Sequence, residues 1–494
     1  MKYQPTIGLE IHLHLKTKSK MFCSCANDDL AKANTNICPV CTAQPGALPV
    51  INQQAIDWTA LLGLALHSEI APRFNFERKN YFYPDLPKGY QITSSSNPPC
   101  IGGYVQVGDR QIHLNHIHLE EDTGRLHHDT ENKNTLVDLN RAGAPLVELV
   151  TEPEITSGAQ AKAFCQELQL ILRCLGIADA DMEKGQMRCE VNVSLRPNSS
   201  KKLGTKVEVK NLNSFRAVER SIDYEIKRQT EILAAGQKVS QENRGWRDDQ
   251  NQTVSQRVKE EAHDYRYFPE PDLPPITFDQ DHYEKLRAKL PELPIQKRQR
   301  FITEYGFNPE DAYLLTTDLD LADYTEKVVS ELQEWITSVE GVEGSATEIW
   351  DNNKKKIIKI LSGWLTSSLF MLLNEAKIKI KDLKITPENL AELVTLAYQN
   401  KVNNLTGKKI LKIMFDTGGD PSHIMEDHDL SQTSDSADLK QIIAKIIADN
   451  PKQLADYRAG KVVLFQYFVG QVMRQTKGTA DPEIIHKLLK EKLD

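Results

Sequence analysis

The first segment of the chain alternates strictly between apolar and other positions. Its apolar positions are Ile7, Leu9, Ile11, Leu13 and Leu15. A period of two is typical of a β-strand that turns one face to a core. Glu10, His12 and His14 then share the opposite face, about 6–7 Å apart along the strand. We therefore predict an opening strand that carries carboxylate and imidazole groups on its polar face.

Two later segments show the same alternation. Their apolar positions are Cys189, Val191, Val193 and Leu195 in the first and Val207 and Val209 in the second. Arg188 and Glu190 fall on the polar face of the first segment, and Lys210 falls on that of the second. Each is predicted to be a strand with one apolar and one charged face.

Two segments have the period of amphipathic helices. One is predicted from a cap at Thr156 or Ser157 to Gly176, and the other from Asn213 or Ser214 to Gly236. Strands and helices follow one another in an irregular order, which favours an α+β fold over a doubly wound sheet. We expect a mixed or antiparallel sheet with helices beside it.

Clustered prolines mark the end of the strand-rich half of the chain. They lie in residues 269–275 and 290–294, where they disfavour helices and regular strand pairing. The remainder has a helical pattern, with a softer break near residues 403–407. The predicted domains are an α+β domain over residues 1–292 and two all-α domains over residues 293–405 and 406–494.

Composition narrows the class of protein. The 494 residues suggest about three domains at roughly 150 residues each. With 40% hydrophobic and 26% charged residues, the chain is neither wholly disordered nor a polytopic membrane protein. The formal charge is −8, from 61 Lys+Arg and 69 Asp+Glu, which argues against coating nucleic acid by bulk charge. A local basic surface for RNA is still compatible with that charge.

The chain shows no pattern of a targeting sequence or of a membrane span. Residues 1–5 lead directly into the strand pattern, without the apolar stretch of a signal peptide. The longest apolar runs, residues 61–66 and 462–465, are far shorter than the roughly 20 residues that a span needs. The eight cysteines do not resemble a secreted disulfide framework, because four of them lie within residues 23–41. We expect a reducing, cytoplasmic environment.

The four clustered cysteines form two close pairs separated by a short loop. They are Cys23 and Cys25 in one pair and Cys38 and Cys41 in the other. This spacing is typical of a tetrahedral Zn²⁺ site, and four protein ligands make such a zinc structural. A redox couple at Cys38 and Cys41, or unligated buried thiols, are the alternatives.

Acidic and imidazole side chains recur in segments that a sheet could bring together. Glu10 and His12 could converge with residues 120–122, and residues 136–148 add Asp138 and Glu148. Neighbouring carboxylates repel one another unless a cation lies between them, and Mg²⁺ that bridges phosphate oxygens would meet that need. The alternative is that these residues are solvated faces of ordinary strands.

No standard phosphate-binding loop is present in the sequence. Residues 405–409 resemble the end of a P-loop, but Lys409 stands where Ser or Thr is required. A nucleotide would instead be held by metal and by side chains such as Lys79, Arg188 and Lys210. Aromatic residues interleaved with basic ones in residues 77–91 suit stacking on RNA bases, or else anchor a packed loop.

Several long motifs, in order along the chain, resemble the family of B subunits of the tRNA-dependent amidotransferases. The matching segments are residues 7–12 (IGLEIH), 78–85 (RKNYFYPD), 119–124 (LEEDTG), 137–141 (VDLNR), 188–197 (RCEVNVSLRP), 204–215 (GTKVEVKNLNSF), 264–271 (DYRYFPEP) and 468–473 (FVGQVM). The resemblance spans essentially the whole chain.

The resemblance implies an ATP-dependent ligase that amidates misacylated Glu-tRNA(Gln) and, in many organisms, Asp-tRNA(Asn). It implies a cradle-shaped catalytic domain, a helical domain and a tail similar to the YqeY family that touches the tRNA. It also implies a heterotrimer, in which an amidase (A) subunit supplies ammonia and a small C subunit clasps both. Residues 94–96 lack an amidase-type serine signature, which agrees with a separate source of ammonia.

The resemblance also suggests roles for individual residues. The expected Mg²⁺ and activation site is Glu10, His12, Glu121 and Glu148. The aromatic residues interleaved with basic ones give Tyr81 and Tyr83 as expected contacts to tRNA in the first domain, and local basic charge gives Lys408, Lys409, Lys412 and Arg474 in the tail. The cysteines match the zinc-bearing branch of the family.

Three functions remain open from the sequence: the activating and amidating subunit, a noncatalytic tRNA-binding scaffold, and a zinc-braced ligase acting on a small molecule. The sequence does not say which misacylated tRNA is used, because that depends on the synthetases of the cell.

Overall fold

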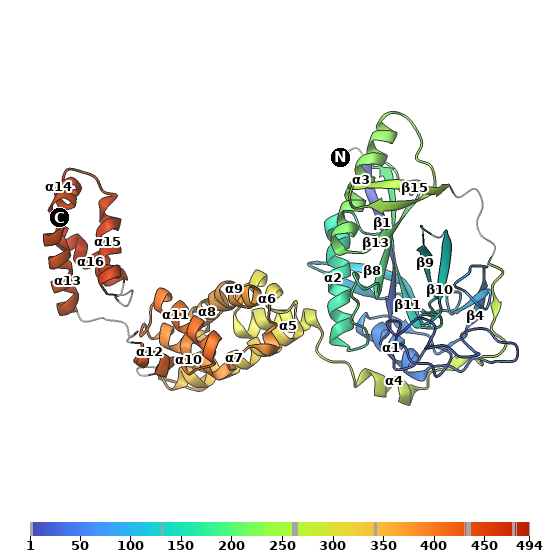
Figure 1. The fold of residues 1–494 in the computed structure, drawn as a ribbon, viewed down its shortest axis with the longest axis horizontal. Coiled ribbons are helices and arrows are strands. Elements are labelled where there is room, and N and C mark those ends of the chain that lie inside the picture. The colour runs from blue at the N-terminus through green and yellow to red at the C-terminus, as the bar shows by residue number, and fades with distance from the viewer. Residues whose placement is uncertain are drawn as a thin grey trace. The chain divides into compact units, whose positions relative to one another are not determined.

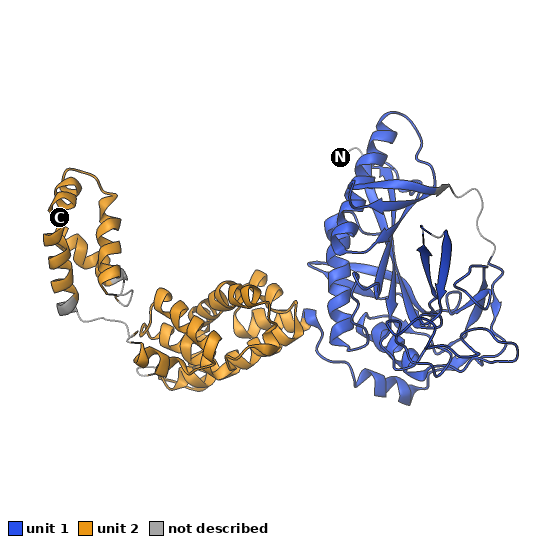
Figure 2. Ribbon diagram, viewed as in Figure 1, with its two compact units in different colours: residues 1–295 blue, residues 296–494 orange. Residues whose placement is uncertain are grey.

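The computed structural model describes residues 3–129, 131, 133–258, 265–339, 343–428, 430, 436–476, 480 and 482–493. These residues form two compact units, residues 1–295 and 296–494 (Figure 2). Asp264, the first residue of the motif at 264–271, lies outside the described residues.

The first unit is built on a 13-stranded sheet (Figure 1). Along the main path of pairing its strands are β15 (Gln252–Val258), β14 (Glu242–Arg247), β13 (Val207–Leu212), β12 (Met187–Pro197), β1 (Tyr3–His14), β11 (Pro145–Thr151), β8 (Arg110–Glu121), β5 (Tyr90–Thr93), β4 (Glu77–Asn80) and β16 (Phe268–Pro269). Strands β6 (Cys100–Ile101) and β7 (Tyr104–Val107) also pair with β8, and β2 (Glu69–Ile70) pairs with β6. Strands β13 and β14 are parallel and the other described pairs are antiparallel, so the predicted mixed sheet is confirmed.

Two small sheets complete the strands of this unit. One is the hairpin of β9 (Arg125–Asp129) and β10 (Asn134–Asp138). The other pairs β3 (Arg73–Phe74) with β17 (Ile276–Thr277).

Helices cover the apolar face of the large sheet. They are α1 (Gln53–Ala65), α2 (Gly158–Cys174) and α3 (Phe215–Ala234), and Figure 1 shows α2 and α3 along one side of the strands. Helix α4 (Gln280–Arg287) packs against α1. The alternating residues Ile7, Leu9 and Ile11 of β1 are buried in the shared core, as predicted. Because side chains alternate along a strand, the polar residues between them lie on the opposite face of the sheet.

Local signals in the sequence set the ends of α2 and α3. The predicted caps are confirmed at Ser157 and Ser214, whose side chains accept hydrogen bonds from backbone N–H groups three residues later. After the helices Gly176 and Gly236 have φ of +68° and +74°, a conformation that favours glycine.

The secondary-structure elements described in the second unit are all helices. Its elements are α5 (Pro294–Arg300, which crosses the boundary), the π-helix η1 (Phe301–Tyr305), α6 (Pro309–Leu315), α7 (Leu319–Thr337), α8 (Ala346–Gly363), the π-helix η2 (Trp364–Leu369), α9 (Phe370–Ala376), the 3-10 helix η3 (Ile380–Asp382), α10 (Pro387–Tyr398), α11 (Asn404–Thr417), α12 (Pro421–Asp427), α13 (Ser436–Asp449), α14 (Pro451–Arg458), α15 (Leu464–Gln475) and α16 (Pro482–Leu493). The predicted α+β fold followed by helices is thus confirmed.

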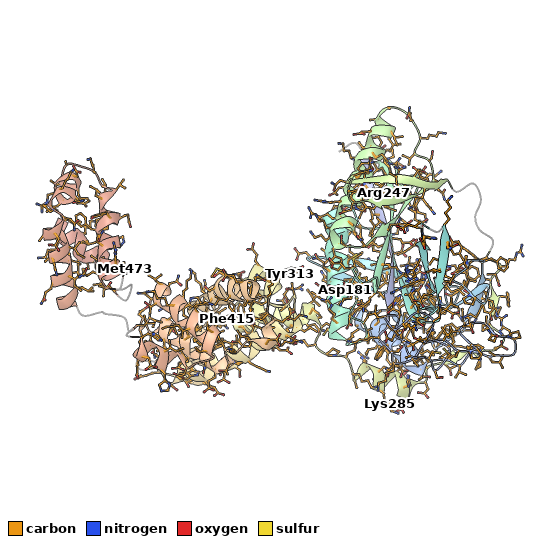
Figure 3. The ribbon with its side chains drawn as sticks, in the orientation of Figure 1. Asp181, Arg247, Lys285, Tyr313, Phe415 and Met473 are labelled. Carbon is orange, nitrogen blue, oxygen red and sulfur yellow. The ribbon has the colours of Figure 1, made fainter. Side chains whose placement is uncertain are left out.

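Two hydrophobic clusters hold these helices together. One extends from Phe301 to Leu430 and includes Phe415 of α11. The other extends from Leu439 to Leu493, and Met473 of α15 packs against it (both residues are labelled in Figure 3). The break predicted near residue 405 lies at the first turn of α11. The apolar face of α11 packs in the first cluster, together with helices that precede the break.

Among the described residues one helical run, 346–376, is long and apolar enough to cross a membrane by length and composition. Of its most apolar window, 56% is buried inside the protein. Leu361, Leu365 and Leu369 of this run belong to the first helical cluster, as expected of a core helix.

Candidate functional site

Four neighbouring strands bring charged side chains together on the polar face of the sheet. His12 of β1 lies opposite Glu148 of β11 on one side and opposite Arg188 of β12 on the other. Glu148 in turn lies opposite His118 of β8. Residues directly opposite one another in an antiparallel pair point to the same face, so side chains from all four strands meet here.

His12, Glu120 and Glu148 form the most compact cluster on this face. Their nearest ligand atoms lie within 4.8 Å of one another, which suits a single metal ion. His12 Nε2 is 3.3 Å from Glu148 Oε2 and 3.9 Å from Glu120 Oε1. Glu120 is 3% exposed, and its Oε2 atom is buried without a hydrogen bond. Carboxylate oxygens with an imidazole nitrogen are a donor set that a divalent cation accepts.

A second buried acceptor lies beside this cluster. Thr93 of β5 is opposite Glu120 across the strand pair, and its Oγ1 atom is buried without a hydrogen-bond partner. Buried polar atoms are rarely left unpaired, because each costs about 1–3 kcal/mol. Thr93 Oγ1, which has no hydrogen-bond partner, and Glu120 Oε2, whose contact with His118 Nε2 is 3.6 Å, therefore fit a site that takes a cation or its bound water.

The charges of this cluster reinforce one another. Burial alone would raise the pKa of Glu148, but His118 and His12 hold that pKa far below its usual range. Burial would likewise lower the pKa of His12 and of His118, but the carboxylates of Glu148 and Glu120 raise both, that of His118 to about 9. The carboxylate of Glu148 is thus ionised at neutral pH and available to a cation.

A second acidic group lies on the same face, one step along the strands. Glu10, Glu190 and Glu208 have carboxylate oxygens within 4.8 Å of one another. Lys210 Nζ lies 2.6 Å from Glu190 and 2.7 Å from Glu208. Burial raises the pKa of Glu190 despite Lys210. The structure therefore places Glu10 with Glu190 and Glu208, beside the cluster of His12 and not within it.

The basic residues predicted to bind phosphate border the acidic clusters. Arg188 is held by buried Asp122, whose Oδ2 also contacts His14 and Arg141. The side chain of Arg188 is 40% exposed, so it is held in place and remains accessible. Lys79 lies over the ring of Tyr265 at 5.1 Å, and Glu120 and Glu148 raise its pKa against the effect of burial. Cations fixed beside carboxylates could bind phosphate groups.

Glu121, one of the predicted metal ligands, lies on the core side of β8. It is 2% exposed, its carboxylate accepts from Lys88 Nζ at 2.5 Å, and Oε1 also accepts from the backbone N–H of Ile92. The structure groups Glu120 with His12 and Glu148 instead. Adjacent residues of a strand face opposite sides, so the alternation of His118, Glu120 and Asp122 was the signal for this choice. Sequence reasoning also overlooked His118.

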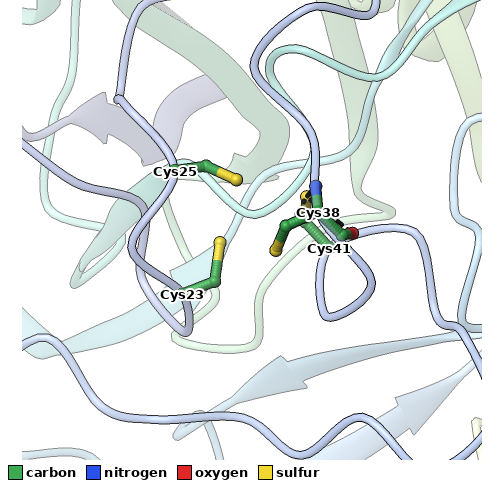
Figure 4. Close-up of side chains that lie close together, drawn as sticks. All are labelled: Cys23, Cys25, Cys38 and Cys41. Atoms are coloured by element: carbon green, nitrogen blue, oxygen red, sulfur yellow. Dashed lines mark hydrogen bonds between the residues drawn. The ribbon is translucent and has the colours of Figure 1, made fainter.

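The four cysteines of the loop meet as predicted. Their sulfur atoms lie within 4.8 Å of one another, and Figure 4 shows the side chains of Cys23 and Cys25 facing those of Cys38 and Cys41. The sulfur atoms of Cys38 and Cys41 are 3.9 Å apart, close to the about 3.8 Å expected for two thiolates on one tetrahedral zinc. The donor set fits structural zinc.

A buried lysine adjoins the cysteine cluster. Lys20 is 0% exposed, and its Nζ lies 3.7 Å from Cys41 Sγ and 3.3 Å from the carbonyl oxygen of Leu139. A hydrogen bond from Cys23, together with the Lys20 ammonium, lowers the pKa of Cys41 to about 4. Four thiolates on Zn²⁺ leave a net negative charge, which a buried ammonium offsets.

Hydrogen bonds tie the cysteine loop to the segment that follows β10. Asn34 bonds the backbone of Val137 and Leu139, and Asn140 Nδ2 donates to the carbonyl oxygens of Ala31 and Lys32. The next residue, Arg141, contacts Asp122, which also holds Arg188. A zinc ion that stabilises the cysteine loop would therefore be linked, through these hydrogen bonds and Asp122, to the polar face.

The predicted tRNA contacts fall in separate parts of the chain. Tyr81 and Tyr83 follow β4, and Tyr83 is 61% exposed, whereas burial raises the pKa of Tyr81. Lys408, Lys409 and Lys412 lie on α11, and Arg474 lies in the last turn of α15.

Comparisons with known proteins agree with these features. Residues 5–284 match the family model of the GatB/GatE catalytic domain, and residues 347–493 match that of the GatB domain. The chain is 45% identical over its whole length, and over 99% of the relative, to the aspartyl/glutamyl-tRNA(Asn/Gln) amidotransferase B subunit of Dehalococcoides mccartyi (strain CBDB1). It is 42% identical to the proteins of the same name from Caldicellulosiruptor saccharolyticus and Persephonella marina, with 100% of both chains covered in each case.

Proposed function

Because this chain belongs to the family of B subunits of the aspartyl/glutamyl-tRNA(Asn/Gln) amidotransferases, we propose that it activates and amidates misacylated tRNA. The substrates are Glu-tRNA(Gln), Asp-tRNA(Asn) or both, and the activating reagent is ATP. The observation that carries the proposal is the cluster of His12, Glu120 and Glu148 beside Lys79 and Arg188.

Activation is needed because a carboxylate resists attack by ammonia. A side-chain carboxylate oxygen of the misacylated amino acid attacks the γ-phosphorus of ATP, and the bond from that phosphorus to the β,γ-bridging oxygen breaks to release ADP. Lys79 and Arg188 would bind the phosphate oxygens and offset their charge. A divalent cation held by His12, Glu120 and Glu148, with Glu10 nearby, would supply further charge neutralisation.

Amidation then consumes the acyl phosphate. The ammonia nitrogen attacks the carbonyl carbon, the bond to the phosphate oxygen breaks, and the nitrogen loses one proton to become the amide. Water competes for the same carbon, so a sheltered site is required. We propose that a separate amidase subunit hydrolyses glutamine to supply the ammonia, and that a small C subunit completes a heterotrimer in the cytoplasm.

The proposal assigns a role to each predicted domain. Residues 1–292 carry the chemistry and the zinc-braced loop at 23–41, residues 293–405 form the helical domain, and residues 406–494 form the YqeY-like tail. The zinc is structural in this scheme, because all four of its positions would be taken by cysteine.

An amidation assay with purified components tests this function. The chain with its amidase subunit, ATP and glutamine is expected to convert misacylated Glu-tRNA(Gln) or Asp-tRNA(Asn) to the amide. With ammonium chloride in place of glutamine, the amidase should become dispensable for turnover. Failure of free ammonia to support any amidation, with tRNA still bound, would favour a noncatalytic scaffold. ATP cleavage with a free amino acid in place of tRNA would favour a small-molecule ligase.

The basic positions of the second unit are proposed to bind tRNA phosphates. Reversing charge at Lys408 and Arg474 together is expected to weaken tRNA binding. The slope of log binding constant against log salt concentration should become smaller by about one for each lost phosphate contact. The measurement is a filter-binding titration at several salt concentrations. A matched control is Lys285→Glu on α4, where the side chain is exposed and pairs with Asp281 one turn earlier. Equal effects of control and test variants would contradict the assignment.

A further inference from the structure

His118 is buried directly behind the proposed metal cluster. We propose that it is a positioning residue, which holds the carboxylates of Glu120 and Glu148 in place for a divalent cation, and that His116 fixes its orientation. The inference rests on the proposed function, since it concerns the same cluster.

His118 contacts both carboxylates with one ring nitrogen. Its Nε2 lies 3.3 Å from Glu148 Oε2 and 3.6 Å from Glu120 Oε2, and its side chain is 4% exposed. His12 Nε2 approaches the same two carboxylates, at 3.3 and 3.9 Å. The side chain of His12 is 19% exposed and that of His118 is 4% exposed, so a cation that arrives from solvent meets His12, and His118 lies behind the carboxylates.

The other ring nitrogen of His118 is held by a chain of hydrogen bonds. Asn115 Nδ2 donates to the carboxylate of Glu152 at 2.7 Å, so Asn115 Oδ1 faces His116 and accepts from its Nδ1, also at 2.7 Å. His116 Nε2 and His118 Nδ1 lie 3.1 Å apart and share a hydrogen bond. The rings of His116 and His118 stack at 5.2 Å, which restricts the tilt of His118.

His118 Nε2 is thereby aimed at two carboxylates that repel each other, and toward carboxylate oxygens a ring nitrogen can only donate. A fixed donor behind metal-binding carboxylates sets their orientation before the cation arrives, and loss of such partners typically costs about 10–100-fold in metal affinity. Without His118 the side chains of Glu120 and Glu148 would turn apart. The cost of reorienting them would then reduce the free energy of cation binding.

The test is Mn²⁺ binding to the full chain, followed by the electron paramagnetic resonance signal of free Mn²⁺. His118→Leu is expected to weaken Mn²⁺ binding by about 10–100-fold. His118→Gln places an amide N–H near the position of Nε2, so it should restore a large part of the affinity. His116→Phe keeps a stacked ring but lacks the nitrogen that bonds His118 Nδ1, so it should weaken Mn²⁺ binding by less than His118→Leu does. His113→Leu, on the exposed part of the same strand, is the matched control and should bind as the wild type does.

Thermal unfolding of each variant separates positioning from folding. A purely structural role predicts lowered stability with no difference in Mn²⁺ affinity between His118→Leu and His118→Gln, and that result overturns the proposal. The proposal is also overturned if His118→Leu binds Mn²⁺ as tightly as the wild type or more tightly, while Glu148→Gln abolishes binding. In that case the metal cluster is supported, but the role of His118 is refuted. If Glu148→Gln leaves wild-type Mn²⁺ binding unchanged, both the cluster and the role of His118 are refuted.

Discussion

Replacing Glu148 with glutamine is expected to lower ATP cleavage that depends on misacylated tRNA by at least about 10²–10³-fold. Glu148 Oε2 lies 3.3 Å from both His12 Nε2 and His118 Nε2, at the centre of the cluster. Removing its charge leaves Glu120 as the sole carboxylate there, and a divalent cation with one anionic ligand is held weakly. The measurement is ADP release with saturating misacylated tRNA, with tRNA binding measured in parallel and expected to be unchanged.

Glu121→Gln is the informative comparison, because this residue has the same chemistry on the other side of β8. Its carboxylate pairs with Lys88 and with the backbone of Ile92. We expect the variant to lose about 1–3 kcal/mol of stability, from the weakened buried contacts, and to keep its Mn²⁺ affinity. Full activity in Glu148→Gln, or loss of Mn²⁺ binding in Glu121→Gln at unchanged stability, would show that the cluster has been assigned to the wrong face. Full activity of Glu148→Gln would also favour a noncatalytic tRNA-binding scaffold.

Replacing Cys41 with serine is expected to abolish zinc binding and to destabilise the first unit. The substitution removes a thiolate and leaves the ammonium of Lys20, which is 0% exposed, without an anionic neighbour at 3.7 Å. Breaking a buried charged pair costs about 3–5 kcal/mol, which corresponds to a Tm lower by about 10 °C for a unit of this size. Zinc content by mass spectrometry and thermal unfolding with and without chelator are the measurements.

Cys174→Ser is the matched control, because that thiol lies outside the loop and donates to the carbonyl oxygen of Glu292, a contact that serine can retain. It should keep both zinc and stability. Freshly purified protein without zinc and with a disulfide between Cys38 and Cys41 would refute the zinc site. Since the loop is bonded to residues 137–140, chelation should also reduce Mn²⁺ affinity at the polar face. Unchanged Mn²⁺ affinity after zinc loss would show that the two sites are independent.

Local signals accounted for much of the fold. The period-two pattern of residues 7–15 and the caps at Ser157 and Ser214 are confirmed, since each depends only on neighbouring residues. The four cysteines also meet as their spacing predicted, because two tight turns on one short loop leave few arrangements. The family resemblance, carried by ordered motifs, agrees with the whole-length matches to amidotransferase B subunits.

The opening strand with its polar face, the two long helices, the cysteine cluster and the family could all be predicted from the sequence. Which acidic residues meet on the polar face depends on the pairing of distant strands. Pairing of β8 and β11 sets Glu120 on the polar face and Glu121 on the core side, because a shift of one residue in register reverses every side chain. Pairing of β1 and β12 likewise places Glu10 opposite Glu190. Register depends on contacts between separate strands, which for β1 and its two neighbours lie more than 100 residues apart in sequence, and no local pattern contains it.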